Sequence, residues 1–286
     1  MVSSRSDKWF NAAIYVILVL IAVAAVFPLL YVISMSLTPY SEVVKNGGFI
    51  VLPRKISFEA YERIFADPAL GRSMLVTVIV TVGGTLVNML FTTLAAYPLS
   101  RRNLPGRTFF LLYMVFTMLF SGGLIPTYLV IQSLGMLNTL WALIIPGAIA
   151  TFNVLILKSF FETLPEELFE SARIDGAREF RILWQVAVPL SLPSMMTVGL
   201  FYMVGHWNSF FSAVLYITDT DLNPLQVVIR NMLLLTQSSE LQAEITVPTA
   251  AMQMAAVIAG SLPIIAVYPF IQKHFTKGML LGAVKG

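Results

Sequence analysis

Residues capable of chemistry are scarce in this 286-residue chain, in which 12% of the residues are charged, and they are densest between Glu162 and Pro189. This segment reads ETLPEELFESARIDGAREFRILWQVAVP. The chain contains no G-x-x-x-x-G-K-[ST], H-E-x-x-H or G-x-S-x-G pattern, which argues against phosphate binding, zinc hydrolysis and serine hydrolysis. It also contains no cysteine, which excludes disulfides and thiolate chemistry. We therefore interpret the charged segment as a docking surface.

The first half of this segment has the signals of a short helix. Thr163 and Glu166 have the spacing of a capping box, and Pro165 suits a first turn, where its missing N–H is harmless. The pattern predicts a helix over residues 164–174. Its neighbouring side chains should form a polar face of Glu166, Glu170 and Arg173 and an apolar face of Leu168, Phe169 and Ala172.

Asp175 and Gly176 should end this helix, because glycine readily adopts the positive φ that a helix C-terminus commonly requires. A second helix over residues 177–186 should then lead to Pro189. The resulting hairpin is either an amphipathic connector on the membrane surface or a docking element for another protein. Its mostly acidic polar face favours the protein, since anionic lipids repel acidic side chains.

The hairpin must be positioned by helices that cross a membrane. Hydrophobic residues make up 57% of the chain and its mean hydropathy is +0.81, which is more apolar than a water-soluble protein requires. Six segments without Asp, Glu, Lys or Arg are long enough to span a bilayer: 11–36, 73–100, 108–131, 139–157, 190–215 and 247–271. The sequence therefore predicts an all-α polytopic membrane protein, a single domain over residues 1–286 with six transmembrane helices and a coupling hairpin at 162–189.

Basic residues predict which ends of these spans face the cytoplasm. In alternate compartments, the tails and loops hold twelve Lys and Arg residues on one side and six on the other. The richer side should be cytoplasmic, which places both termini and the hairpin inside. The first external loop has five basic residues, but long loops cross with little regard to charge. The first span could instead be a cleaved secretory signal, although its apolar run is longer than such signals have.

The scarcity of ionisable residues within the predicted spans indicates how transport by this protein would be driven. Carriers driven by protons or sodium commonly keep an ionisable residue within the membrane, and His206 is the sole candidate here. Since the chain has no nucleotide-binding pattern either, it is a passive channel, an ion-coupled carrier or a part driven by another subunit. The charged hairpin favours the third interpretation.

Four stretches of the chain resemble one family of transport proteins. Glu170-Ser171-Ala172, then Gly176, then Val186-x-Val188-Pro189 follow the spacing of the "EAA" loop of binding-protein-dependent ABC importer permeases: E-A-A, three residues, G, nine residues, I-x-L-P. The departures are small or similar in shape. Residues 95–101 (AAYPLSR) and 281–286 (LGAVKG) are similar to the six-span, maltose-type carbohydrate permeases. Residues 120–149 resemble the subgroup associated with complex and acidic oligosaccharides.

This resemblance implies a function and a set of partners. The chain would be a non-catalytic, multi-pass subunit of a bacterial inner-membrane importer for oligosaccharides, including acidic ones such as uronate oligomers. It would pair with a second homologous permease on a dimeric ABC ATPase and receive sugar from an extracytoplasmic binding protein. It would hold no cofactor, since ATP and Mg²⁺ would be bound by the ATPase. The implied coupling positions are Glu170, Ser171, Ala172, Asp175, Gly176, Pro189, Lys285 and Gly286.

The external loop 218–246 is implied to reach into the cleft of the binding protein, and a length of about thirty residues favours a functional role over that of a lid. Its acids Asp219, Asp221, Glu240 and Glu244, against a single base, Arg230, also suggest a protein partner. Sugars are held by aromatic faces and hydrogen-bonding groups. The candidates along the substrate path are Asn153, Tyr202, His206, Asn208 and Gln253, although buried amides such as Asn153 often form interhelical hydrogen bonds instead.

Overall fold

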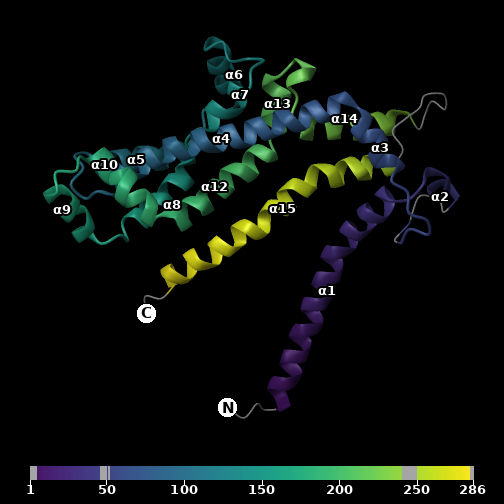
Figure 1. Ribbon diagram of the computed structural model, residues 1–286, viewed down its shortest axis with the longest axis horizontal. Helices are drawn as coiled ribbons and strands as arrows, with labels where there is room; N and C mark the ends of the chain where they lie inside the picture. Colours follow the sequence, from purple (N-terminus) through teal and green to yellow (C-terminus); the bar gives the residue numbers. More distant parts are fainter. Residues whose placement is uncertain (1–4, 46–49, 51, 240–249, 284–286) are drawn as a thin grey trace. The chain divides into compact units, whose positions relative to one another are not determined.

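The computed structural model describes residues 5–45, 50, 52–239 and 250–283, and all regular secondary structure within these ranges is helical (Figure 1). The all-α prediction is therefore confirmed. The chain divides into two compact units, Met1–Gly71 with Ile229–Leu262 and Arg72–Val228 with Pro263–Gly286. The coupling hairpin lies within the second unit.

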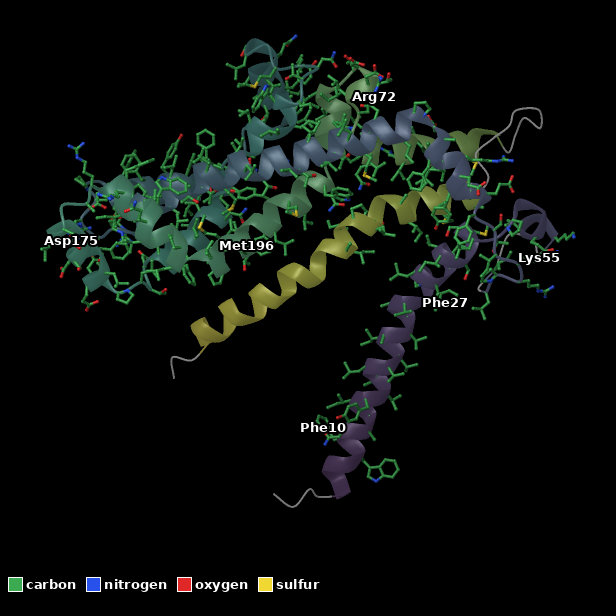
Figure 2. All side chains as sticks on the ribbon, viewed as in Figure 1. Phe10, Phe27, Lys55, Arg72, Asp175 and Met196 are labelled. Atoms are coloured by element: carbon green, nitrogen blue, oxygen red, sulfur yellow. The ribbon has the colours of Figure 1, made fainter. Side chains whose placement is uncertain are left out.

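The first unit begins with α1 (Arg5–Ser36), which is long and apolar enough to cross a membrane. None of the described residues in its most apolar window is buried, and Figure 2 shows Phe10 and Phe27 projecting outward from it. So continuous an apolar surface requires lipid or another membrane protein around it. The unit also contains α2 (Tyr40–Lys45), α3 (Glu59–Ala66) and the first part of α15 (Ala250–Ala283).

The second unit is built on α4 (Pro68–Ser100), the other unbent helix of membrane-spanning length among the described residues. Three bent pairs are also long and apolar enough to cross. They are α5 (Arg107–Leu119) with α6 (Leu124–Ser133), α7–η1 (Trp141–Gly147) with α8 (Thr151–Phe161), and Glu179–Leu190 with α12 (Leu192–Trp207). The shorter elements α13 (Phe211–Tyr216) and η3 (Thr220–Leu222) follow, with the first turn of α14 (Leu225–Ser239), whose remainder from Ile229 belongs to the first unit. The predicted sixth span, 247–271, overlaps α15.

The bends divide segments that the hydropathy pattern presents as continuous. The predicted span 108–131 is two helices meeting at 112°, and the predicted span 139–157 bends by 53°. In the first case α5 ends at Leu119, where Phe120 is extended, and Gly123, with a φ of 90° that no α-helical residue adopts, is the N-cap of α6. In the second, Pro146 and Gly147 precede the break. A hydropathy profile measures how apolar a segment is, and it contains no information about breaks in the backbone of that segment.

Different helices pack against the two halves of α4. Near its start, the packed side chains are Val76 and Val80 of α4, Leu143 of α7, Ala213 of α13 and Val227 of α14. Near its end, they are Ala96 and Tyr97 of α4, Leu157 and Phe161 of α8, Phe169 of α9 (Glu166–Ile174) and Ile182 of α10 (Glu179–Ile182). Since an α-helix rises 1.5 Å per residue, about 40 Å separates Arg72 from the end of α4. The hairpin therefore lies at the opposite end of α4 from Arg72, which pairs with Asp221 of η3, and Figure 1 shows α9 and α10 beyond the far end of α4.

Candidate functional site

The site is the hairpin of α9 and α10, with Asp175 and Gly176 in the turn between them (Figure 2). Gly176 has a φ of 79°. Its N–H donates to the carbonyl of Arg173 at 3.0 Å, and the N–H of Ala177 donates to the carbonyl of Ala172 at 2.9 Å. This pair of bonds is a Schellman motif, in which a left-handed residue satisfies the last carbonyls of a helix. The predicted role of Gly176 as the helix terminator is confirmed.

The start of α9 differs from the prediction. The helix begins at Glu166 with Pro165 as its N-cap, and within the described residues no side chain caps it. The hydroxyl and the N–H of Thr163 both donate to the carbonyl of Phe160, at 2.7 and 2.9 Å. Thr163 therefore completes the last turn of α8, and its side chain is turned away from the next helix. The predicted capping box is wrong.

The two faces of α9 are clearly separated. Phe169 is fully buried in the core beside α4, and Ala172 packs partly against the same core. The opposite surface leaves Ile174 86% exposed and Leu168 42% exposed. Glu170, Ser171 and Asp175 are exposed beside them. This surface therefore combines exposed aliphatic side chains with acids, and its predicted role in docking stays a prediction.

Arg173 forms one ion pair within α9 and another that joins α9 to α10. The guanidinium of Arg173 lies 3.4 Å from a carboxylate oxygen of Glu166 and 2.9 Å from one of Glu179. Burial opposes the charged form of Glu179, but hydrogen bonds from Tyr97 and Arg173 outweigh it, and the pKa of Glu179 falls below its ordinary value. Glu179 is therefore ionised at neutral pH. Its contribution to stability is present above the pKa of the unfolded chain and is lost only as acid protonates the folded carboxylate.

Three residues outside the hairpin connect α4 and α5 to it or to the end of α8, which precedes it, and the sequence patterns assign none of them a role. The Tyr97 hydroxyl donates to Glu179 at 2.8 Å. Arg101 contacts Glu166 at 3.3 Å, and Arg107 pairs with Glu162. A signal was present in the sequence, because the hairpin's excess of acids faces a loop with three arginines on the same predicted side of the membrane.

Pro189 lies beyond the hairpin, in α11 (Val188–Leu190). It follows one π-helical turn, Leu183–Ala187 (η2), and precedes an 86° bend at Ser191. A proline inside a helix removes one N–H donor and crowds the carbonyl four residues earlier, and a wider turn at that point relieves the crowding. Pro189 therefore shapes the exit from the hairpin towards α12, while the docking face is formed elsewhere. The other predicted coupling positions, Lys285 and Gly286, lie outside the described residues.

The predicted external loop has a helix of its own, since α14 occupies residues 225–239. Its described acids are engaged within the protein: Asp221 pairs with Arg72 at the start of α4, and Asp219 accepts a hydrogen bond from the N–H of Asp221 at 2.9 Å. Glu240 and Glu244 lie outside the described residues. Both acids organise the turn that precedes α14, and the suggestion that the acids of this loop meet a protein partner stays a prediction.

Two of the five substrate-path candidates join helices. The Tyr202 hydroxyl bonds to the hydroxyl of Thr92 at 2.6 Å and accepts from the N–H of Ala150 at 3.0 Å. The Nε2 atom of His206 lies 3.0 Å from the amide nitrogen of Asn88. These contacts place both side chains between α4, α12 and the start of α8, where polar groups in a membrane protein commonly hold helices together.

The remaining candidates are spread over different elements. Asn153 is buried on α8, whereas Asn208 is exposed after the end of α12 and donates to the carbonyl of Val204 at 2.9 Å. Gln253 belongs to α15 in the other compact unit. The role of all five residues in the sugar path stays a prediction.

Tyr202→Phe should lower stability without changing the apparent KM for the transported sugar. The substitution leaves the N–H of Ala150 without its acceptor, which costs about 1 kcal/mol. Thermal unfolding of the purified complex and the concentration dependence of uptake would measure the two effects. A several-fold change in KM at unchanged stability would show that Tyr202 contacts the sugar instead.

Helices long and apolar enough to span a membrane, with an exposed hairpin at the end of one of them, define a polytopic membrane protein. Residues 90–281 match the model of the binding-protein-dependent transport system inner membrane component, and the chain belongs to this family. The family resemblance predicted from the hairpin is confirmed, and the family argues against a passive channel or an ion-coupled carrier.

Two relatives from Bacillus subtilis match this chain over nearly its full length. It is 43% identical over 290 residues to Protein LplC of Bacillus subtilis, with 100% of this chain and 98% of the relative covered. It is 44% identical over 285 residues to the polygalacturonan/rhamnogalacturonan transport system permease protein YtcP of the same organism, with 98% and 99% covered. The fold is similar to a chain in the crystal structure of a bacterial ABC transporter involved in the import of the acidic polysaccharide alginate. That match has a TM-score of 0.89 and 31% identity, and covers 96% of this chain and 99% of the other.

Proposed function

We propose that this permease carries acidic oligosaccharides, such as uronate oligomers, into the cell, driven by a separate ATPase that docks on α9. The observation that carries the docking proposal is the tip of the hairpin. It presents Leu168, Ile174 and the acids around them to solvent, while Phe169 anchors the other face of the helix. The chain itself is not a catalyst in this proposal, and the ATPase dimer binds ATP and Mg²⁺.

The proposed assembly has three further components: a second homologous permease, the ATPase dimer and an extracytoplasmic sugar-binding protein. The exposed apolar surface of α1 supports a membrane partner or surrounding lipid. ATP-driven closure of the ATPase dimer would displace α9, and the helices attached to it would tilt to expose the sugar pathway alternately to each side. Affinity purification of the chain should recover the ATPase, and removal of residues 166–176 should abolish that recovery.

The acidic class of sugar rests on the relatives, since YtcP and the alginate importer carry names of acidic polysaccharides. Proteoliposomes containing the whole assembly should import oligogalacturonates and fail to import neutral maltodextrins of equal length. Import of the neutral sugar alone would leave the permease role intact and remove the acidic assignment.

The hairpin and both termini should face the cytoplasm, and η3 should face outward. The structure allows a sharp test, because Ser171 and Thr220 are both exposed and lie at opposite ends of α4. Since the chain has no cysteine, a single cysteine at either position can be labelled alone. A membrane-impermeant maleimide added to intact cells should label Thr220→Cys and spare Ser171→Cys until the cells are opened. The reverse labelling pattern would invert the topology.

A further inference from the structure

Arg101, the residue that follows α4, contacts three other helical elements through one side chain. Its guanidinium carbon lies 3.8 Å from the centre of the Phe169 ring of α9 and 4.9 Å from the centre of the Tyr97 ring of α4. One terminal nitrogen lies 3.3 Å from Glu166 of α9, and the other makes a longer contact, 3.5 Å, with the carbonyl of Phe161 at the end of α8. The side chain is 13% exposed. This is a nearly buried cation at the junction of α4, α8 and α9.

The stretch of chain that leads from α9 to α12 is not one regular helix. It passes the left-handed turn at Gly176, the π-helical turn Leu183–Ala187 and the 86° bend at Ser191. Each of these interrupts the regular backbone hydrogen bonds that make a helix stiff. By contrast, α4 is one element of 33 residues. A displacement of α9 is therefore transmitted more directly to α4, provided that α9 is fastened to it.

We propose that Arg101 is the positioning residue that fastens the coupling helix α9 to the ends of α4 and α8, so that the three move as one body when the ATPase acts. This inference rests on the proposed docking of α9. Arginine suits the position because its planar guanidinium stacks on the Phe169 ring while its edge pairs with Glu166. A lysine at this position keeps the positive charge but lacks the planar guanidinium group. Arg101→Lys should therefore retain only part of the coupling.

The test compares Arg101→Met with Arg102→Met in the reconstituted assembly of both permeases, ATPase and binding protein. Arg102 is the exposed neighbour and gives a matched loss of one positive charge. Arg101→Met should raise the ATP hydrolysed per oligosaccharide imported about tenfold, within the usual range of couplings between sites. The ratio for Arg101→Lys should lie between those of the wild type and Arg101→Met. The ratio for Arg102→Met should equal that of the wild type. An unchanged ratio in Arg101→Met, or an equal loss of hydrolysis and import, would overturn the proposal.

A distance measurement separates this inference from the proposed docking itself. Spin labels at Asn103→Cys and Glu167→Cys, both exposed, report the separation of the end of α4 from α9. In the otherwise wild-type assembly this distance should stay constant when ATP is added, and with Arg101→Met it should change by several ångströms. A wild-type distance that changes with ATP would overturn the role of Arg101. Failure of the wild-type chain to recover the ATPase at all would instead remove the docking proposal.

Discussion

Gly176→Val should reduce coupled import about tenfold or more while leaving the protein in the membrane. Gly176 has a φ of 79°, and no described atom lies within 4 Å of an added Cβ, so the whole cost falls on the backbone. A left-handed conformation costs a residue with a Cβ about 1–2 kcal/mol, and more for a β-branched one. Relief of that strain breaks the bonds to Ala172 and Arg173 and displaces the docking face at the end of α9. Sugar uptake and ATP hydrolysis would both be measured in proteoliposomes.

Two variants control for strain and for conformation. Gly135→Val places the same side chain at a φ of 66° with open space around it, in the turn after α6, outside the hairpin. It should leave the ATP used per sugar imported unchanged. Gly176→Asn should retain most of the coupling, because asparagine tolerates the left-handed region. Wild-type coupling in Gly176→Val would contradict a role for this turn.

Shortening residues 233–243 to a brief Gly-Ser linker should reduce import several-fold and weaken stimulation of the ATPase by the sugar-loaded binding protein. The start of α14 would keep its anchors, since the N–H of Leu225 donates to the hydroxyl of Thr77 at 2.8 Å and Val227 packs into the core at α4. Loop-closure free energy changes only slowly with length, so the shortened chain should still fold. ATPase assays with and without binding protein would measure the effect.

The internal control for the shortened variant is recovery of the ATPase on purification, because the replaced residues include none of the hairpin. Recovery should equal that of the wild type. If the variant assembles normally and imports sugar at the full rate, the segment is a lid on its own protein and the proposed reach towards the binding protein is wrong.

Structural features that depend on residues close together in the chain could be predicted from the sequence. Asp175-Gly176 after an amphipathic run predicts a helix that ends at Ile174, and the structure ends α9 there with the expected positive φ. Glu166 and Arg173 were expected on one face and form an ion pair. Local reasoning failed at Thr163, because the end of α8 and a possible start of α9 compete for the same hydroxyl. The residues between the two helices do not reveal which of the two will hold it.

The sequence by itself determined that this chain belongs in a membrane, that it is helical, and that one charged hairpin interrupts its spans, because these properties follow from apolar length, charge and local backbone preference. The tertiary structure alone decided what fastens the hairpin. Arg101 is 65 residues from Glu166 along the chain, and Tyr97 is 82 residues from Glu179. Pairs so distant carry no periodic signal and meet only when α4, α8 and α9 pack together. The same packing leaves Phe169 buried and Ile174 exposed on one short helix, and this division is the feature on which the proposed docking rests.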